Sequence, residues 1–332
     1  MSATHPDGSG NHGRKLPLFY RLIQNSSASV LVLLVVLIVI GRFMNSNFLD
    51  WGNLTSIFRS TSFVAIIALG MTFVFIALEL DLSVGSVVAL SGIVVGMLLK
   101  EGVPIPVAFV AGVLSGLASG IVTGFVIVHF NIPSMIGSLG MQFILRGVVY
   151  VVTKGIPLYP LPEGFEELGL GNVLGIPTPW LIYMALAAVF WYLLKHTTYG
   201  RAIYAIGGNK DTAWLCGLNV KTLRMSTYWI TGALSGLVGV LLASRLSSAQ
   251  PNAGQTWEML VIASIIVGGV SMFGGVGTIV GTVIGSLLIG MLTNFLVMIR
   301  LSVYWQNIAI GVIILGAVIL DQYRKNLALR MR

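Results

Sequence analysis

The sequence predicts an all-α membrane protein, a polytopic transmembrane helical bundle of about eight to ten spans with discontinuous or re-entrant segments. Of its 332 residues, 56% are hydrophobic and only 9% are charged, whereas soluble domains carry about 25% charged residues. Apolar stretches also recur at close to the roughly 20 residues that cross a bilayer. Spans of that length use the whole chain and leave no room for a separate soluble domain.

Ten apolar stretches follow one another along the chain. They lie at 28–44, 61–79, 82–99, 104–128, 132–152, 179–194, 225–243, 257–273, 278–298 and 303–320. Very short breaks follow 61–79 and 257–273, so each of these stretches fits either a separate span or part of a discontinuous helix. We expect a polar cytoplasmic tail at 1–25, a membrane domain at 26–322 and a basic cytoplasmic tail at 323–332.

The net charge of +8 is best explained by membrane topology. With ten crossings and a cytoplasmic N-terminus, twelve Lys and Arg residues lie in the two tails and the 195–224 loop, and six lie in the opposite loops. This asymmetry satisfies the positive-inside rule, so both termini are expected in the cytoplasm. Nucleic acid is therefore not an expected partner. The lone Cys216 excludes an internal disulfide and any multi-cysteine metal site.

Glycine recurs at every fourth position in two of the apolar stretches. The positions are Gly112, Gly116, Gly120 and Gly124, and then Gly277, Gly281 and Gly285, with a shorter pair at Gly232 and Gly236. Small residues at this spacing line one face of a helix and let two membrane helices approach closely. The stripes predict tight helix packing and indicate nothing about a ligand.

Common catalytic motifs are absent from the sequence. It contains no H-E-x-x-H, no G-x-S-x-G and no phosphate-binding G-x-x-x-x-G-K-[ST]. We therefore expect neither an enzyme nor a bound cofactor or metal, and we do not expect the chain itself to bind ATP.

The first of three notable segments is E-L-D-L-S-V-G-S at 79–86, between two apolar stretches. Carboxylates beside hydrocarbon are costly and usually face a cavity, a partner or water. Glu79, Asp81, Ser83 and Gly85 are therefore candidates for lining a translocation path. The alternative is a tight cytoplasmic turn in which Asp81 or Ser83 caps the next helix.

The second segment concentrates glycine, at Gly268, Gly269, Gly274, Gly275 and Gly277. Because glycine costs up to about 1 kcal/mol relative to alanine in a helix, a bend or re-entrant loop is expected here. These glycines are candidates for a hinge, or for a simple turn between helices.

The third segment is the polar loop 195–224. Its residues outline a cytoplasmic helix of about two turns, with a turn at Gly207-Gly208, an N-cap at Asn209, Asp211 in the first helical turn and a stop at Gly217. Trp214 lies in this helix without a span to anchor. The helix is therefore expected to dock on another protein, or alternatively to rest on the membrane surface.

Six stretches carry a family resemblance. They are A-L-G-M-T-F-V at 68–74, D-L-S-V-G-S at 81–86, S-L-G-M-Q-F-I-L-R-G at 138–147, G-R-A-I-Y-A-I-G-G-N at 200–209, R-L-S-S-A-Q-P at 245–251 and V-G-G-V-S-M-F-G-G-V-G-T-I-V-G-T at 267–282. In this order, across roughly residues 45–320, the sequence resembles the permease subunits of ribose, xylose and galactose-type ABC importers, within the branched-chain amino acid permease superfamily.

The resemblance implies a three-part system at the bacterial inner membrane. Its parts would be a periplasmic sugar-binding protein, this permease paired with a second copy or a sister permease, and a cytoplasmic ABC ATPase that binds the ATP. The 195–224 loop would carry the coupling helix that fits the ATPase. The candidate coupling residues are Gly200, Arg201, Gly207, Gly208, Asn209, Asp211, Trp214 and Gly217.

Three residues depart from the family pattern. Small or acidic residues are usual where Lys210 and Trp214 stand, and glycine commonly stands in place of Glu79. The first two departures bear on which ATPase the chain accepts. The carboxylate of Glu79 indicates either a different substrate or a different turn.

Arg146 falls inside a predicted span, about six residues or roughly 9 Å from its outer end. At that depth its side chain can reach the membrane surface, and a structural pairing is one interpretation. The other places Arg146 in the translocation path, for which Gln142 in the same motif is also a candidate.

The leading interpretation is a permease that carries a monosaccharide, a ribose-like pentose or a hexose, without changing it chemically. The first alternative is an importer of the same superfamily with another small polar cargo, such as a deoxysugar, a sugar-like signal, a polyol or an amino acid. An ion-coupled secondary transporter needs ionisable residues deep in several spans, which fits the sequence less well. A scaffold or sensor that does not transport is the remaining alternative.

Overall fold

The computed structural model describes residues 26–330 of the chain. Nearly all regular structure in this part is helical, apart from one two-stranded antiparallel hairpin. In chain order the elements are α2 (Ser26–Met44), α3 (Trp51–Ile76), α4 (Val84–Lys100), α5 (Ile105–His129), α6 (Ser134–Thr153), α7 (Glu167–Leu170), β1 (Asn172–Val173), β2 (Ile176–Pro177), α8 (Thr178–His196), α9 (Thr198–Gly208), α10 (Lys210–Leu215), α11 (Val220–Leu246), α12 (Trp257–Val267), α13 (Ile279–Met298) and α14 (Val303–Arg330).

Six helices of the described part are long and apolar enough to cross a membrane, namely α3, α5, α6, α8, α11 and α13. Shorter apolar helices accompany them at Val30–Met44 within α2, at α4 and at α12. Each of the ten apolar stretches of the sequence contains a helix. The fold is thus an all-α polytopic bundle with short helical segments, and the total of eight to ten crossings stays a prediction.

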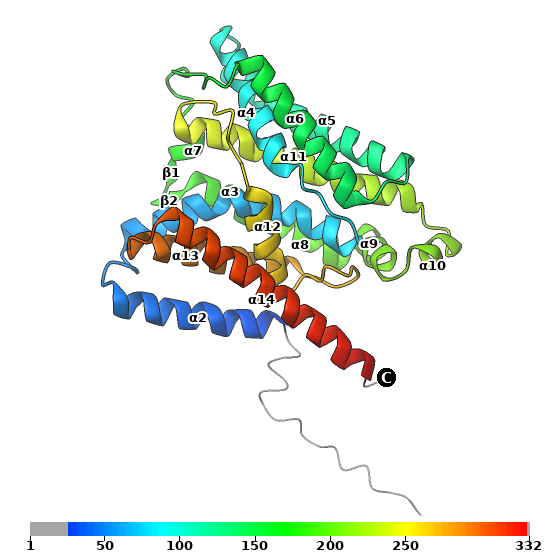
Figure 1. The fold of residues 1–332 in the computed structure, drawn as a ribbon. Helices are drawn as coiled ribbons and strands as arrows, with labels where there is room; N and C mark the ends of the chain where they lie inside the picture. The colour runs from blue at the N-terminus through cyan, green and yellow to red at the C-terminus, as the bar shows by residue number, and fades with distance from the viewer. Residues whose placement is uncertain (1–25, 331–332) are drawn as a thin grey trace, which may run out of the picture.

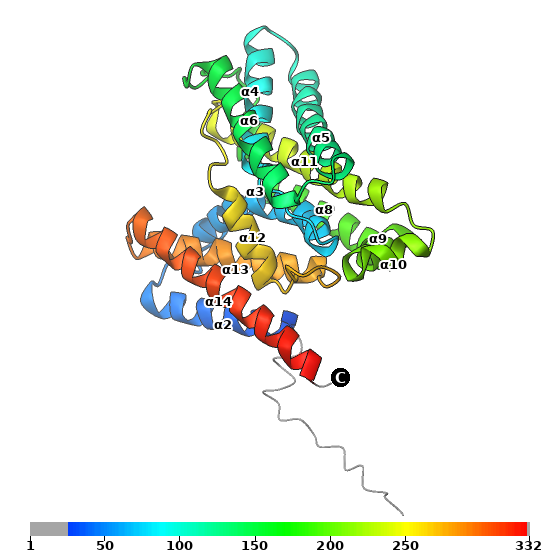
Figure 2. The same ribbon diagram turned by 45° about the vertical axis from the view of Figure 1, so that its right-hand side comes forward.

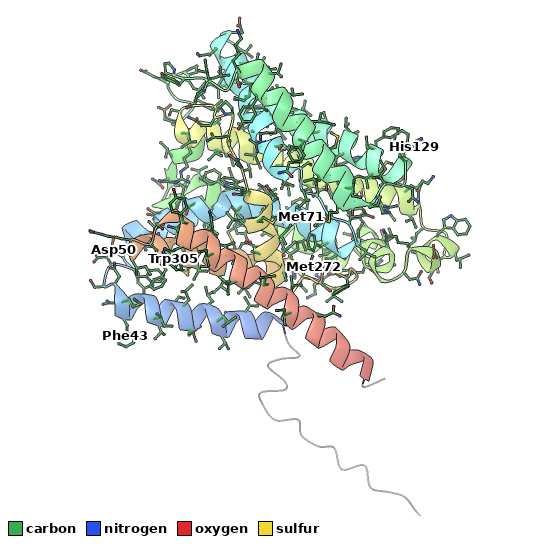
Figure 3. All side chains as sticks on the ribbon, in the orientation of Figure 1. Phe43, Asp50, Met71, His129, Met272 and Trp305 are labelled. Carbon is green, nitrogen blue, oxygen red and sulfur yellow. The ribbon has the colours of Figure 1, made fainter. Side chains whose placement is uncertain are left out.

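Helices α3 and α11 form the centre of the bundle. Figure 1 shows α4, α5 and α6 on one side of them and α2, α13 and α14 on the other. The core reflects this arrangement, because Met71 of α3 is fully buried in the middle of the molecule, whereas Phe43 points away from it (Figure 3).

The two ends of the bundle differ in what they carry. Helices α9 and α10 lie at the same end as the start of α2 and the end of α14, as both ribbon views show (Figures 1 and 2). Helix α7 and the β1–β2 hairpin lie at the opposite end. The predicted topology requires this grouping, and the side of the membrane on which each end lies stays a prediction; we call the first the α10 end and the second the hairpin end.

The glycine stripes pack helix against helix, as predicted. A Cβ atom on Gly116 of α5 would collide with the backbone of Gly232 and Gly236 of α11. On α13, Gly281 and Gly285 likewise let the helix approach the backbone at the end of α12. These contacts explain how α5 and α11 form the most extensive helix pair of the bundle.

Helix α3 is longer than its apolar stretch, which starts only at residue 61. The helix begins at Trp51, where the Asp50 carboxylate caps it by accepting a hydrogen bond from the Gly52 N–H at 3.1 Å. In its first turn, the Asn53 amide exchanges hydrogen bonds of 3.1 and 3.0 Å with the Asn294 amide of α13. These polar side chains lower the local hydropathy without ending the helix.

Helix α12 is shorter than its apolar stretch, and it ends at Val267 instead of continuing to 273. Gly269 follows with φ of 88°, in the left-handed region that favours glycine. Residues 268–278, which we call the glycine loop, connect α12 to α13 without forming a helix. This loop is the bend that the glycine content predicts.

Candidate functional site

Three segments far apart in sequence meet at the C-terminal end of α3. The Gly275 N–H of the glycine loop donates a hydrogen bond to the Ile76 carbonyl at 2.9 Å. Helix α9 packs on the same point, since a Cβ on Gly207 would collide with the Ile76 carbonyl and the Gly275 nitrogen. The Tyr204 hydroxyl of α9 also donates to the Gly277 carbonyl at 2.6 Å. The end of α3, the glycine loop and α9 therefore form one junction.

The prediction of a turn at Gly207-Gly208 is wrong. Both glycines lie in the last turn of α9, and the chain changes direction at Asn209, which has φ of −161°. The absence of a side chain at Gly207 lets α9 approach α3 closely, whereas a Cβ on Gly208 would meet only open space. A glycine pair fits both uses, and the local sequence does not distinguish them.

Helix α10 follows the prediction. The Asn209 side chain caps it by accepting from a backbone N–H of its first turn at 2.9 Å, and Asp211 lies in that turn. Gly217 follows the helix with φ of 82° and ends it. Trp214 and Leu215 project outward, 68% and 76% exposed. The helix thus presents two large apolar side chains that none of residues 26–330 covers.

The remaining coupling candidates lie at the start of α9. Gly200 is buried against the carbonyl of Leu194, where a side chain would not fit. Arg201 is exposed and lines a hollow of about 440 Å³ with Lys195 and Tyr204, between α8, α9 and α13. This end of the molecule therefore carries basic side chains on α8 and α9 as well as the apolar tip of α10.

Glu79 forms the centre of a buried charged cluster. Its Oε1 accepts from Arg224 Nε at 2.6 Å and from Lys210 Nζ at 2.8 Å, and the Tyr228 hydroxyl donates to its Oε2 at 3.1 Å. The Glu79 side chain is 2% exposed, against 12% for Arg224 and 33% for Lys210. We call these four residues the Glu79 cluster. It joins α10 and α11 to residues 77–83 between α3 and α4, which we call the 77–83 break.

Asp81 and Ser83 are buried in the same break. Asp81 Oδ1 accepts from the Ser83 N–H at 2.9 Å and from the Ser83 hydroxyl at 2.6 Å. Ser83 is the residue before α4, yet its hydroxyl bonds Asp81 and does not cap the helix. Of the two alternatives, Asp81 is the residue whose side chain accepts a backbone N–H just before α4, whereas Ser83 has helical φ and ψ of −76° and −13° and not the extended conformation of a capping residue.

Arg146 of α6 holds three backbone carbonyls. Its Nη1 donates to the carbonyls of Pro251 and Ala253, both at 2.8 Å, and its Nη2 donates to the Gly85 carbonyl at 3.0 Å. Residues 247–256 connect α11 to α12, and Gly85 lies in the first turn of α4. Arg146 thus ties three segments together, as its structural interpretation predicted, and the same residue borders a polar pocket.

That pocket lies between α6 and the start of α12 and has a volume of about 220 Å³. We call it the Arg146 pocket. Its lining residues are Ser86, Gln142, Phe143, Arg146, Tyr150, Gln255, Thr256 and Glu258. The structure therefore places the candidates Gln142 and Arg146 in one pocket, and Gly85 borders it through its contact with Arg146.

Glu258 is the functional residue that sequence reasoning missed. It is 6% exposed, and its Oε1 accepts from Gln142 Nε2 at 3.2 Å. Its Oε2 has no hydrogen-bond partner among the described residues. The signal was a carboxylate at the second position of the apolar stretch 257–273, which is costly in a membrane helix unless it faces a cavity or a partner.

The pocket can bind a small polar molecule, because an accepting carboxylate oxygen lies beside amide and guanidinium groups. Nucleophile and base are not paired in it as acyl or phosphoryl transfer requires. Within residues 26–330, no group of three or more His, Cys, Asp and Glu side chains is placed to hold a metal. Its geometry fits recognition of a polar ligand.

Comparisons with known proteins agree with this membrane architecture. The family model described as branched-chain amino acid transport system / permease component matches residues 53–318. The chain is 40% identical over 299 residues to the ribose import permease protein of Haemophilus influenzae, covering 88% of this chain and 92% of that protein.

Two relatives from Escherichia coli K12 are similar over comparable lengths. The ribose import permease protein is 41% identical over 303 residues, covering 89% of this chain and 93% of its own. The D-allose transport system permease protein is 35% identical over 309 residues, covering 93% and 95%. No solved structure matches the chain. With a family model that spans most of its length, this multi-pass membrane protein belongs to the branched-chain amino acid transport system / permease component family.

Proposed function

We propose that this protein is the permease subunit of a binding-protein-dependent ABC importer in the bacterial inner membrane, and that it carries a monosaccharide such as ribose. One observation carries the proposal, namely the similarity to ribose import permeases over about nine-tenths of both chains. An importer of this kind takes energy from a separate ATPase and cargo from a periplasmic sugar-binding protein. Two permease subunits, identical or sister chains, enclose the path.

The Arg146 pocket is the part of this path that the subunit contributes. The Gln142 amide, which donates to Glu258 Oε1, lies in the pocket lining and can exchange hydrogen bonds with a sugar hydroxyl. Arg146 keeps the pocket in shape by holding the backbone on two sides. A neutral polar cargo fits these groups better than an apolar one, because an apolar cargo leaves a buried carboxylate unpaired.

Coupling to the ATPase is assigned to α10. Its exposed Trp214 and Leu215 form the apolar contact, and the Glu79 cluster links the helix to the 77–83 break. The glycine loop lies at the same junction and is the hinge on which the bundle alternates between access to either side. This is the alternating-access mechanism expected of such importers.

Purification of the tagged protein in mild detergent from its native cells tests the assembly. Recovery of an ABC ATPase supports the proposal, whereas transport by the chain alone in vesicles without ATP overturns it in favour of an ion-coupled transporter. Uptake of labelled D-ribose and D-allose by cells with and without the chain then identifies the cargo. Failure of both sugars, with uptake of another polar solute, moves the protein to the alternative cargo class.

The substitution Glu258→Gln tests the pocket within the same uptake assay. It keeps the shape of the side chain and removes the charge, so we expect uptake to fall about tenfold to a hundredfold, as for one charge-assisted hydrogen bond of about 1.5–3 kcal/mol. Glu101→Gln, an exposed carboxylate just after α4, is the matched control and should transport like the wild type. Equal uptake by both variants excludes Glu258 from the path.

A further inference from the structure

The hollow of about 440 Å³ between α8, α9 and α13 lies apart from both the Arg146 pocket and the Glu79 cluster. Its volume falls within the range of roughly 300–1,000 Å³ that is usual for small-molecule sites. Its walls come from the last turns of α8, the first half of α9 and the start of α13. We call it the Lys195 hollow. Its size fits a ligand, and the transport path proposed above uses a different pocket.

Two cations line the Lys195 hollow without a counter-charge. Lys195 comes from α8 and Arg201 from α9, no carboxylate lies among the lining residues, and neither cation forms an ion pair within residues 26–330. The hydroxyls of Tyr204 and Thr278 are already engaged, since the first donates to the glycine loop at 2.6 Å and the second caps α13. The hollow therefore carries two positive charges, and an anion is the ligand that complements them.

The rest of the lining is apolar and reaches the surface of the bundle. Leu194 and Ile279 are buried, whereas Trp191 and Val280 are 38% and 49% exposed. Both exposed residues belong to helices that are long and apolar enough to cross the membrane, α8 and α13. Apolar surface left exposed on such helices is a surface for lipid. The hollow is thus bordered by lipid on its exposed side.

Charge and apolar surface are ordered along the membrane normal. Lys195 is the second-to-last residue of α8, and Trp191 lies one turn, about 6 Å, deeper in the span. The Lys195 ammonium lies 5.3 Å from the centroid of the Trp191 ring, which is close enough for a cation–π contact. Arg201 follows the span, in α9. From the surface inward, the hollow therefore presents cations and then apolar side chains, in the same order as the headgroup and acyl chain of a phospholipid.

We infer that the Lys195 hollow binds an anionic phospholipid, with the lipid phosphate between Lys195 and Arg201 and an acyl chain along Trp191 and Val280. Basic pockets between membrane helices recognise anionic headgroups in this way. A zwitterionic lipid fits less well, because its own cation is repelled by the two side chains. An acidic peptide segment would match the charges but leave the apolar part of the hollow uncovered. The site goes beyond the proposed transport function and does not depend on which cargo is carried.

Quenching of Trp191 by brominated lipid tests this site on the full chain. The protein is placed in nanodiscs of phosphatidylcholine that contain a rising fraction of phosphatidylglycerol, with bromine on the acyl chains of one lipid at a time. The contribution of Trp191 is the difference between the wild type and Trp191→Phe. The two titrations give the binding constant at this residue for phosphatidylglycerol relative to phosphatidylcholine. Each of the two cations should favour the anionic lipid about fivefold, so we expect a ratio of about 25.

Arg201→Gln is the decisive variant, because Arg201 is exposed and its loss leaves the contact between Lys195 and the Trp191 ring in place. It should lower the ratio about fivefold. Lys195→Gln should lower it by a similar factor. Lys221→Gln is the matched control, because Lys221 is an exposed lysine at the start of α11 that does not line the hollow, and it should leave the ratio unchanged.

The outcomes separate the lipid from other ligands. A ratio near one overturns the site, as does a preference that Arg201→Gln and Lys221→Gln lower equally. Relief of the quenching by inorganic phosphate at constant ionic strength also overturns it, because the hollow then takes a free anion. A ratio that falls about fivefold in Arg201→Gln and in Lys195→Gln alone supports it. None of these results bears on transport, which the uptake and purification experiments test separately.

Discussion

Replacing Glu79 with glutamine removes the only carboxylate in the Glu79 cluster and leaves two cations behind. Arg224 is the critical one, because its side chain is 12% exposed and its Nε lies 2.6 Å from Glu79 Oε1. Removing one partner of a buried ion pair costs about 3–5 kcal/mol, since the other charge stays buried without compensation. The ion pair between Lys210 and Glu79 contributes less to stability, because the Lys210 side chain is 33% exposed and exposed ion pairs contribute about 0.2–1 kcal/mol.

These magnitudes predict an order among four variants. Glu79→Gln should destabilise the protein most, Arg224→Gln by a comparable amount, and Lys210→Met by under about 1 kcal/mol. The double variant Glu79→Gln/Arg224→Gln should be less destabilised than the sum of its parts, because neither member of the buried pair then carries an unpaired charge. The coupling free energy between these two positions should be about 2–3 kcal/mol.

The assay is thermal unfolding of the purified protein in one detergent, followed by intrinsic fluorescence and by recovery of the folded peak in gel filtration. Lys221→Met is the control, because Lys221 is an exposed lysine at the start of α11 outside the cluster. Strictly additive effects of the two substitutions at 79 and 224 would refute the reasoning. So would a Lys210→Met variant as unstable as Glu79→Gln.

Three further predictions concern single contacts. Arg146→Met removes donors to three carbonyls and should lower stability by about 2–4 kcal/mol, measured by thermal unfolding, whereas Arg42→Met, at an exposed position on α2, should change little. Gly207→Ala should prevent folded protein from accumulating, because its Cβ collides with backbone on two segments, whereas Gly208→Ala should be tolerated; yield of monodisperse protein checks both. Trp214→Ala should reduce co-purification of the ATPase about tenfold or more, as expected for a central aromatic contact, without lowering the unfolding temperature.

Local features of the structure could be predicted from the sequence. The cap at Asn209, the stop at Gly217 and the glycine stripes depend on neighbours within a few residues, and each was confirmed. The predicted turn at Gly207-Gly208 was wrong. Gly207 is a glycine because it packs against Ile76 of α3, 131 residues earlier in the chain. Rules that consider one stretch at a time do not reveal such a contact.

The sites depend on long-range pairing and were predicted only in part. Glu79 and Lys210 each departed from the family pattern, and the structure joins these two departures in one ion pair. Nothing local indicates that residues so distant in sequence meet. Gln142 and Arg146 were candidates, but their partner Glu258 was not, because a single acidic residue at a helix start usually interacts with the helix dipole.

The hydrogen bonds from Arg146 to the 247–256 connection also affect how much water can reach the backbone inside the membrane. With eleven residues, α12 is about 16 Å long, roughly half of the hydrocarbon thickness, so irregular backbone must enter the bilayer to reach it. Bare carbonyls there would recruit water, and a file of water conducts protons. By donating to Pro251 and Ala253, the guanidinium does the solvating that water would otherwise do. Arg146 thereby satisfies with protein donors two carbonyls of a connection that would otherwise need water at that depth.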